Sequence, residues 1–325
     1  ILGVGTTGYG EMLMKEAYNA DFHVVETVAH AKAARSYLPD VSFILDIGGQ
    51  DMKAIWVDNG VVTDIVVNEA CSSGCGSFLE NFASNLGIPT KQIASEAFSS
   101  KTPAMLGSRC TVFMNSSIVT EQRQGKNPAD IMAGLCRSII ENVFTKVIRL
   151  SNLDRLGDKI MVQGGTFMND AVLCAFEEYV GREVMRAPYP GLMGAVGAAM
   201  LTREHMEAQR DASGELPASS FIGLDALEGL SYTQESNLTC PFCANHCNRT
   251  RISFSNQTSF VTGNRCSKGE ILGDPKDDSV RAQLKSANSR ADAVPNLFEE
   301  RKELLFADYP CEQLCEDRNV TIGLP

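Results

Sequence analysis

The chain has 325 residues, of which 44% are apolar, and a formal net charge of −11 at neutral pH. This length and apolar content suffice for two or more domains with hydrophobic cores. The negative charge argues against nucleic acid or an anionic bilayer as the main partner, and the absence of any run of about 18 apolar residues argues against a membrane span, so we expect proteins or small molecules as partners.

Residues 1–205 alternate short β-branched runs with helical stretches, the pattern of an α/β domain. The predicted strands are ILGVG, FHVVETV, SFILDIG, KAIWVDNG and VVTDIVVN, and the predicted helices are ENFASNLG, NPADIMAGLCRSIIENVFTKVIRLSNL and NDAVLCAFEEYVG. Residues 42–68 form three of these strands, joined by a glycine turn and an Asp-Asn-Gly turn. We therefore predict an antiparallel meander there, which argues against a Rossmann fold.

The remainder of the chain divides into three predicted segments. Residues 206–232 are polar and predict a linker, residues 233–270 hold a small cysteine-rich unit, and residues 271–325 predict a helical connector and the start of a further domain. Because the chain begins at Ile1 within a strand-like stretch, we expect a piece of a longer protein.

Glycine-rich turns follow two of the predicted strands, in DIGGQDMK at residues 46–53 and in MVQGGTFMND at residues 161–170. Backbone N–H groups in such turns cradle phosphate oxygens, and an adjoining Asp holds Mg²⁺ or its water. A third stretch, GLMGAVGAAM at residues 191–200, has small residues along one helical face, which predicts close packing beneath a nucleotide. Any one of these turns alone is most simply a hairpin or a loop.

Together, and in this order, the loops resemble those of the actin, sugar-kinase and heat-shock-chaperone superfamily, which has a ribonuclease H-like fold. The resemblance implies that Asp46 organises Mg²⁺, that Gly48 and Gly49 contact phosphates, and that Gln50 orients the attacking water. It also implies that Gly164 and Gly165 approach the adenosine of ATP or ADP. The superfamily's first phosphate loop does not precede Ile1, so we expect an N-terminally truncated domain that binds nucleotide weakly.

Two cysteines, Cys71 and Cys110, each stand just before an apolar-periodic helix and among small residues. A helix N-terminus offers unpaired N–H groups and partial positive charge, which stabilise a thiolate or an anionic iron–sulfur cluster. The sequence therefore predicts both as cluster ligands. Cys75 is close by, and we interpret it as a spectator, with a redox-sensitive thiol or an extra ligand as alternatives.

These motifs together resemble the activators of 2-hydroxyacyl-CoA dehydratases and the related ATPase subunits of benzoyl-CoA reductase. The resemblance covers residues 1–203, through TTGYG, DIGGQDMK, the cysteine-and-glycine motif at residues 71–79, SRCTVF and VQGGTFMN. It implies a homodimer in which Cys71 and Cys110 of both subunits hold one 4Fe-4S cluster. It further implies ATP-driven transfer of one electron, received from reduced ferredoxin or flavodoxin, to an acyl-CoA dehydratase-like or other iron–sulfur enzyme.

Four further cysteines, Cys240, Cys243, Cys247 and Cys266, have the spacing C-x2-C-x3-C-x18-C. Paired thiols on a turn with a fourth from a later hairpin match the needs of a tetrahedral metal site. The spacing leaves zinc and a second iron–sulfur cluster open, and free structural thiols are the plain alternative. His246 is a weaker candidate ligand that lies between two of these cysteines.

The other cysteines carry ordinary predictions. Eleven cysteines without a recognisable leader indicate reduced thiols or metal ligands in a cytoplasmic protein. Cys136 and Cys174 lie in apolar helical patterns and are predicted core residues, and Cys311 and Cys315 are predicted free thiols. We interpret His30 as a helix-packing or capping residue rather than a metal ligand.

Two other functional classes compete with the activator. A kinase that phosphorylates a small molecule would use the same nucleotide loops but has no evident need for Cys71 and Cys110. A noncatalytic interaction module with structural zinc would explain a missing first phosphate loop. Iron content separates the first alternative from the activator, and ATPase activity of the longer parent protein separates the second.

Overall fold

The computed structural model describes residues 1–68, 75–292 and 297–306. The chain divides into two compact units, Ile1–Leu230 and Ser231–Pro325, a boundary that falls within the connection expected at residues 206–232. Part of that connection belongs to the first unit, because the backbone N–H of Ser220 donates to Asp21 Oδ1 over 2.7 Å. No described helix is long and apolar enough to cross a membrane.

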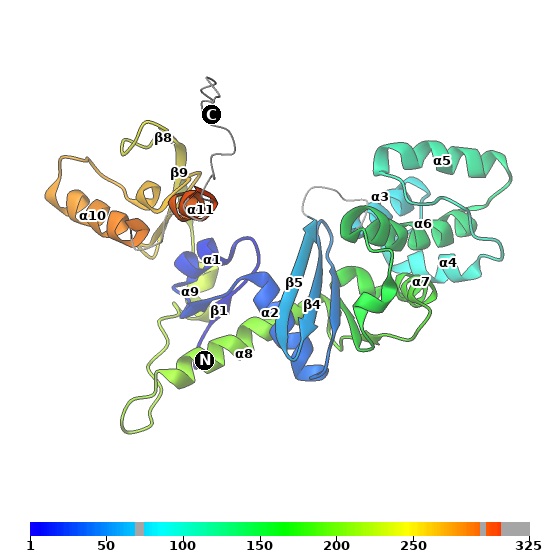
Figure 1. Ribbon diagram of the computed structural model, residues 1–325, viewed down its shortest axis with the longest axis horizontal. Helices are drawn as coiled ribbons and strands as arrows, with labels where there is room; N and C mark the ends of the chain where they lie inside the picture. Colours follow the sequence, from blue (N-terminus) through cyan, green and yellow to red (C-terminus); the bar gives the residue numbers. More distant parts are fainter. Residues whose placement is uncertain (69–74, 293–296, 307–325) are drawn as a thin grey trace, which may run out of the picture. The chain divides into compact units, whose positions relative to one another are not determined.

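The first unit is built around a five-stranded sheet with the strand order β5-β4-β3-β6-β7 (Figure 1). The strands are β3 (Phe43–Ile47), β4 (Met52–Asp58), β5 (Val61–Asn68), β6 (Ile160–Gln163) and β7 (Met185–Arg186). β3, β4 and β5 form the predicted antiparallel meander, whereas β6 and β7 run parallel to β3. Asn59 and Gly60 both have positive φ, as the tight turn between β4 and β5 requires.

Each face of this sheet is covered by its own helices, because successive strand residues point to opposite sides. Phe43, Leu45 and Val162 pack in the larger core with residues of α3 (Gly76–Asn85), α4 (Ile93–Ser99), α6 (Pro128–Asn142) and α7 (Asp170–Val180). Ile44, Ile55 and Met161 point the other way and pack with residues of α2 (Glu26–Tyr37) and α8 (Met193–Ala208). Figure 1 shows the two helical groups on either side of the sheet.

Helices α2 and α8 approach unusually closely. A Cβ at Gly197 would overlap the backbone carbonyl of Ala29, so glycine is what allows the two backbones to meet. The small residues of α8 therefore pack against α2, and their expected packing beneath a nucleotide stays a prediction. α1 (Glu11–Tyr18) and α9 (Leu224–Glu228) complete this side, beside the short parallel pair β1 (Gly5–Thr6) and β2 (Phe22–His23).

Two predicted elements change at their ends. The predicted strand FHVVETV supplies only β2, because the alanine-rich stretch that follows favours a helix and α2 already begins at Glu26. The long predicted helix begins as expected, with a capping box between Asn127 and Asp130 and Pro128 at its first turn. It continues from α6 into a π-helical segment, Val143–Ile148, and stops at Arg149, which has a positive φ.

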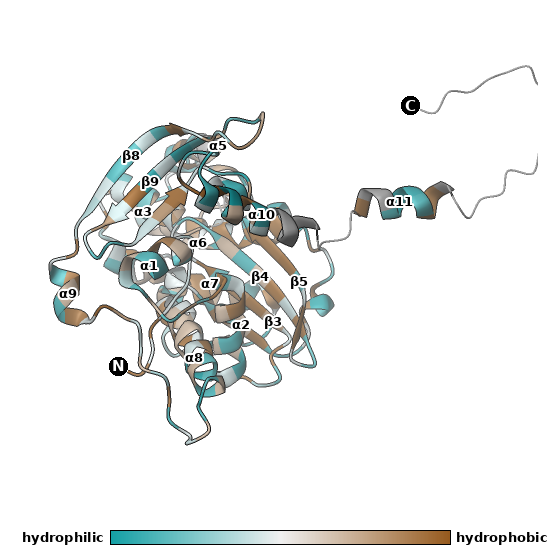
Figure 2. Ribbon diagram, turned by 90° about the vertical axis from the view of Figure 1, so that its left-hand side faces the viewer, coloured by the Kyte–Doolittle hydropathy of each residue, from teal (hydrophilic) through white to brown (hydrophobic). Residues whose placement is uncertain are grey.

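The second unit has the antiparallel sheet order β10-β9-β8, formed by β8 (Tyr232–Thr239), β9 (Asn248–Phe254) and β10 (Ser259–Thr262). α10 (Asp278–Asp292) and α11 (Leu297–Phe306) follow in sequence. α10 is mostly hydrophilic (Figure 2). The buried apolar side chains in the described part of this unit are Cys240, Val261 and Val280, which do not amount to a hydrophobic core.

Candidate functional site

The two glycine loops lie at one edge of the five-stranded sheet. β3 and β6 are adjacent and parallel, so Gly48–Gly49 and Gly164–Gly165 leave the sheet at the carboxyl ends of neighbouring strands. In open α/β sheets ligands bind outside these strand ends. Gly164 has a φ of +92°, and a Cβ there would overlap the backbone of Ile47. Glycine is therefore required where the two loops approach each other.

Hydrogen bonds tie the first residues of α3 and the loop after β6 to the loop after β3. The backbone N–H groups of Gly76 and Ser77 donate to the carbonyls of Gly48 and Gly49 over 2.9 and 2.8 Å. Thr166 Oγ1 also donates to the Gly48 carbonyl over 2.9 Å. A cavity of about 500 Å³ opens beside these contacts, and Gly49, Gly76, Gly165 and Thr166 are among its lining residues. This volume is in the range of small-molecule sites.

A second cavity, of about 680 Å³, lies elsewhere in the first unit. Its lining includes Thr6, Met14 and Thr202, from β1, α1 and α8. Neither glycine loop lines it. Although it is the larger of the two, the backbone groups suited to phosphate lie at the smaller one, which we take as the candidate nucleotide site.

A row of polar side chains crosses the sheet just below the two loops. Lys53 on β4, Asp46 on β3 and Gln163 on β6 are register partners, so they share the face that α2 covers. Asp46 and Lys53 are each 3% exposed and Gln163 is fully buried. We call these three side chains the polar row. Two residues further from the loops on the same three strands, Ile44, Ile55 and Met161 form apolar packing on the same face.

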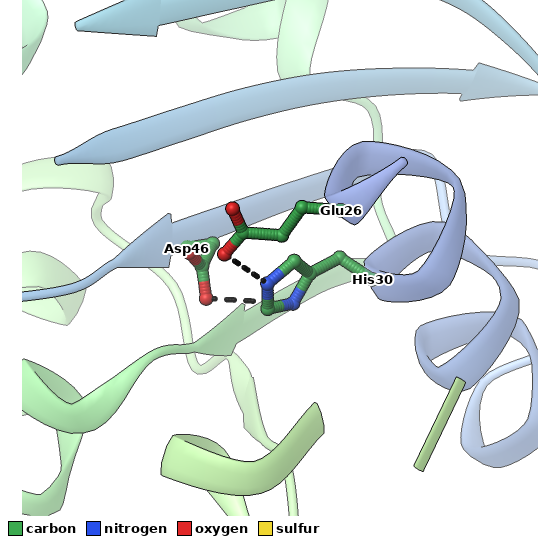
Figure 3. A group of neighbouring side chains, drawn as sticks. All are labelled: Glu26, His30 and Asp46. Atoms are coloured by element: carbon green, nitrogen blue, oxygen red, sulfur yellow. Dashed lines mark hydrogen bonds and ion pairs between the residues drawn. The ribbon is translucent and has the colours of Figure 1, made fainter. Parts of the chain in front are cut away.

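Two side chains of α2 meet this row. His30 Nε2 lies 3.2 Å from Glu26 Oε1, and His30 Nδ1 lies 2.7 Å from Gln163 Nε2 and 3.6 Å from Asp46 Oδ1. Figure 3 shows the ring between the two carboxylates. Lys53 Nζ is 3.3 Å from Glu26 Oε2 and also donates to Asp51 Oδ2. The imidazole of His30 and the ammonium of Lys53 thus lie among carboxylates in a largely buried cluster.

The charges in this cluster shift one another. The hydrogen bond with His30 lowers the pKa of Glu26, with partial opposition from burial and support from Lys53. Burial raises the pKa of Asp46, although His30 and Lys53 act against it. Burial alone would lower the pKa of Lys53, but the hydrogen bond to Asp51 and the neighbouring carboxylates raise it. Lys53 therefore supplies the positive charge that balances Glu26 and Asp51.

The TTGYG loop joins the same cluster. Tyr9 Oη donates to Asp51 Oδ2 over 3.3 Å, and Lys53 Nζ lies 5.7 Å from the centre of the Tyr9 ring. Asp51 comes at the end of the loop after β3. The loop between β1 and α1 is therefore held against the candidate phosphate loop.

The predicted cluster ligands are only partly described. Cys71 lies outside the described residues. Cys110 is exposed and is the N-cap of α5 (Thr111–Arg123), with its carbonyl accepting from the N–H groups of Phe113 and Met114. Cys75 is the N-cap of α3 and is fully buried in the larger core.

The predicted core cysteines differ in burial. Cys136 is buried as predicted, and burial raises its thiol pKa to about 12. Cys174 is only half-buried. Its thiol pKa is raised, first by burial and then by the nearby carboxylates of Glu178 and Glu177. Cys311 and Cys315 lie outside the described residues.

The four cysteines of the second unit gather at one end of its sheet. Cys240 follows β8, Cys247 precedes β9, and Cys266 comes shortly after β10, which runs antiparallel to β9. The backbone N–H of Cys240 donates to the Cys247 carbonyl over 2.9 Å, and Cys243 is exposed between them. Within the described residues, no three of these sulfur atoms lie within 4.8 Å of one another. Metal binding there stays a prediction.

Comparison with known proteins identifies the first unit. The sequence profile of the BadF/BadG/BcrA/BcrD ATPase family matches residues 1–202. The chain belongs to this family. It is 34% identical over 194 residues to an (R)-2-hydroxyglutaryl-CoA dehydratase activating ATPase of Acidaminococcus fermentans, covering 60% of this chain and 72% of that protein. It is 31% identical to an activator of lactoyl-CoA dehydratase of Anaerotignum propionicum, covering 61% and 74%.

Solved structures agree with this assignment. Component A of the (R)-2-hydroxyglutaryl-CoA dehydratase of Acidaminococcus fermentans matches with a TM-score of 0.58 and 31% identity, covering 63% of this chain and 77% of that one. The activator of the 2-hydroxyisocaproyl-CoA dehydratase from Clostridium difficile, with bound ADPNP, matches with a TM-score of 0.57 and 28% identity, covering 63% and 74%. The actin-like ATPase fold expected for the first unit is confirmed.

The structure of this BadF/BadG/BcrA/BcrD ATPase brings some predicted residues together and separates others. Gly49 and Gly165 line one cavity, and Gln50 is exposed beside them. Asp46 instead points to the face beneath α2. Sequence reasoning missed the partners Lys53 and Gln163 and interpreted His30 as a helix-packing or capping residue rather than a metal ligand. The available signal was a polar residue beside a glycine turn in three otherwise apolar strands, near the end of β3 and β6 and near the start of β4.

Proposed function

We propose that this chain is the ATP-hydrolysing part of an activator that delivers single electrons to an iron–sulfur enzyme of the acyl-CoA dehydratase or benzoyl-CoA reductase type. The observation that carries the proposal is the convergence of two separate glycine loops, through Gly49 and Gly165, on one cavity in a chain of this ATPase family. The exposed thiol of Cys110 at a helix start favours an electron carrier over a kinase, which has no use for it.

In the proposed ATPase, the glycine loops do the positioning. Gly48 and Gly49 would receive the phosphates, and Gly164 and Gly165 the adenosine. Gln50, exposed at the phosphate loop, would orient the water that attacks the γ-phosphorus while the bond to ADP breaks. Asp46 is 3% exposed, so we expect it to act on the Mg²⁺ of the bound nucleotide through water.

The proposed 4Fe-4S cluster would be shared by two chains. Such a cluster needs four thiolates, so Cys71 and Cys110 of each chain suffice for one cluster per homodimer. Cys110 fits this role because it is exposed and begins a 13-residue helix, whose N–H groups and dipole favour an anionic centre. A cluster held there would supply one-electron chemistry, between a ferredoxin or flavodoxin as donor and the partner enzyme as acceptor. We place this reaction in the cytoplasm.

We also propose that Cys240, Cys243, Cys247 and Cys266 hold a structural zinc ion. The second unit buries very few apolar side chains, and domains without a sufficient core commonly depend on a metal for stability. The strand order brings the four cysteines to one end of the sheet. A structural need favours zinc over a second iron–sulfur cluster, and closing the site requires the exposed Cys243 and Cys266 to turn inward.

The metal content of anaerobically purified protein tests both parts. We expect about two irons and about one zinc per chain. Cys110→Ala and Cys71→Ala should each remove the iron and leave the zinc, whereas Cys247→Ser should do the reverse. Cys174→Ser, a half-buried thiol outside both groups, is the matched control and should leave both metals. About six irons without zinc would contradict the zinc proposal, and normal iron in both alanine variants would contradict the shared cluster.

The electron transfer itself needs a separate measurement. The reduced protein, mixed with a dehydratase of this class, should reduce it in the presence of ATP and Mg²⁺ but not of ADP. ATP hydrolysis without electron delivery, in protein with full iron content, would contradict the proposed electron transfer.

A further inference from the structure

One side chain touches the base of both nucleotide loops. Asp46 lies two residues before Gly48, and Gln163 immediately precedes Gly164. His30 Nδ1 lies 3.6 Å from Asp46 Oδ1 and 2.7 Å from Gln163 Nε2. The imidazole thus bridges the two strands at the points where they turn into the glycine loops.

Two buried polar atoms beside the ring make no hydrogen bond within the described part of the chain. Asp46 Oδ1 and Gln163 Oε1 are both buried, and neither has a hydrogen-bond partner among the described residues. Leaving such atoms without a partner is unfavourable, so removing the polar ring beside them would increase the cost of burying them. Whichever nitrogen carries the proton, one side of the ring faces α2 through Glu26 and the other side faces the polar row.

The backbone that carries His30 is itself fixed. α2 packs on α8 at Gly197, where the backbones meet, and a Cβ at Gly194 would lie 3.3 Å from His30 Nε2. The ring is therefore enclosed between α8 and the sheet, with only 6% of the residue exposed. A displacement of α2 would have to move the ring or break its contacts with the row.

A bound cation is the competing explanation for this cluster. Glu26, His30 and Asp46 each offer one ligand atom, all within 4.8 Å of one another. Lys53 Nζ, however, lies 3.3 Å from Glu26 Oε2 and already supplies positive charge beside the carboxylates. An ion held by these three ligand atoms would lie close to this ammonium, which opposes its binding, so we treat the cluster as a set of contacts between side chains.

We infer that His30 is a positioning residue, which holds the phosphate loop and the adenosine loop at a fixed spacing and ties both to α2. The role in nucleotide binding rests on the proposed ATPase function, whereas the effect on the loops does not. His30 would contribute no group to the reacting phosphate. Substitution of His30 should therefore make both loops less ordered, even when no nucleotide is bound.

The test is amide hydrogen exchange of the full chain without nucleotide. In His30→Ala, exchange at residues 48–50 and 164–166 should rise about tenfold, the effect of losing one buried hydrogen bond. Thr202→Val is the matched control, because Thr202 is a buried polar residue of the same helical layer that bonds only within α8, to the Ala198 carbonyl. It should lower the melting temperature without loosening either loop.

Two more variants separate hydrogen bonding from space filling, and they serve if the alanine variant does not fold. His30→Asn keeps a hydrogen-bond acceptor, its amide oxygen, near the position of Nδ1, which faces the donor Gln163 Nε2, and should restore much of the protection, whereas His30→Leu fills the space and should not. Wild-type protection in His30→Leu, or loosening of only one loop in His30→Ala, would overturn the inference. So would a tightly bound divalent ion that is lost in Glu26→Gln.

Nucleotide affinity then separates this inference from the proposed function. If the wild type binds ADP, His30→Ala should weaken binding about tenfold, and His30→Asn should weaken it less. If the wild type binds no nucleotide, the ATPase proposal fails for this chain. The exchange of the two loops still decides the role of His30 in that case.

Discussion

The two units of this chain differ in how they bury apolar side chains. All the hydrophobic clusters formed by described residues lie in the first unit, where they fill both faces of the five-stranded sheet. The second unit has three strands and two helices in its described part, yet only Cys240, Val261 and Val280 are buried apolar residues there. The first unit is therefore stabilised by its core, and the proposed zinc site would supply the stability that the second unit does not gain from apolar burial.

The difference also separates two uses of cysteine. Cys75 and Cys136 are core residues of the first unit, where the sulfur acts as a small apolar group. The cysteines of the second unit lie at strand ends and are mostly accessible, which suits ligands. Residue type alone therefore does not predict the role of a thiol, and its burial has to be known as well.

Removing the metal should produce the largest effect and tests the comparison directly. Structural zinc sites contribute on the order of 10 kcal/mol to folding, so we expect residues 231–292 to unfold in a strong chelator. The first unit should keep its melting temperature. Limited proteolysis measures both: rapid cleavage beyond Leu230 with an intact first unit is the expected pattern, and unchanged resistance beyond Leu230 would contradict it.

Truncating a core side chain should destabilise the first unit and leave the second unchanged. Phe144 is fully buried and its ring stacks on Tyr179, with centroids 4.8 Å apart, and on Phe176 at 5.8 Å. Phe144→Ala should lower the free energy of unfolding of the first unit by about 3–5 kcal/mol. Urea unfolding followed by the circular dichroism of the whole chain measures this change. If the free energy of unfolding of the second unit fell by the same amount, the two units would not be independently stabilised.

The glycine loops sharpen the comparison within the first unit. Gly164→Ala should cost about 2–4 kcal/mol, because alanine is strained at a φ of +92° and its Cβ would overlap Ile47. Gly165→Ala is the matched control: no atom lies within 4 Å of a Cβ at that position. Thermal unfolding of both variants compares them. Equal melting temperatures would mean that the close approach of the two loops is not required for the fold.

The smallest expected effect is on acid stability. The lowered pKa of Glu26 means that the folded state binds its proton less readily than the unfolded chain. Its contribution is present above the usual value of 4.5 and is lost as pH falls through the lowered pKa. In the wild type the free energy of unfolding should fall between about pH 5 and 3. Glu26→Gln should make this fall smaller, by less than about 1 kcal/mol.

Urea midpoints across that range measure this change. The exposed Glu228→Gln, on α9, is the control and should leave the slope unaltered. The raised pKa of Asp46 acts in the opposite direction. A carboxyl group that ionises less readily in the folded state than in the unfolded chain makes the folded state less stable as pH rises. A steeper slope in Glu26→Gln would contradict the assigned role of its carboxylate.

Much of the fold could be predicted from short-range patterns. The Asn59–Gly60 turn between two β-branched runs indicates a hairpin, and the glycine pairs after Ile47 and Gln163 indicate where the loops begin. These signals are local, because turn chemistry depends on a few neighbouring residues. The antiparallel meander and the order of the nucleotide loops follow from them.

The polar row could not be predicted in the same way. Lys53, Asp46 and Gln163 become neighbours only through strand register, and Gln163 is more than a hundred residues from the other two along the chain. The start of α2 was missed for a related reason: the β-branched stretch around Val24 and Val25 favours a strand until the alanines beyond it are weighed. Strand register decided the first case, and the helix propensity of the alanine-rich stretch decided the second.

The contact at Gly197 also limits how the first unit moves. Shear between packed helices relies on side chains that slide over one another, and α2 and α8 have backbone against backbone at this point. Such a pair travels as one rigid body. Any large displacement of α2 relative to the sheet is therefore of the hinge type, with the flexing residues at the ends of the two helices.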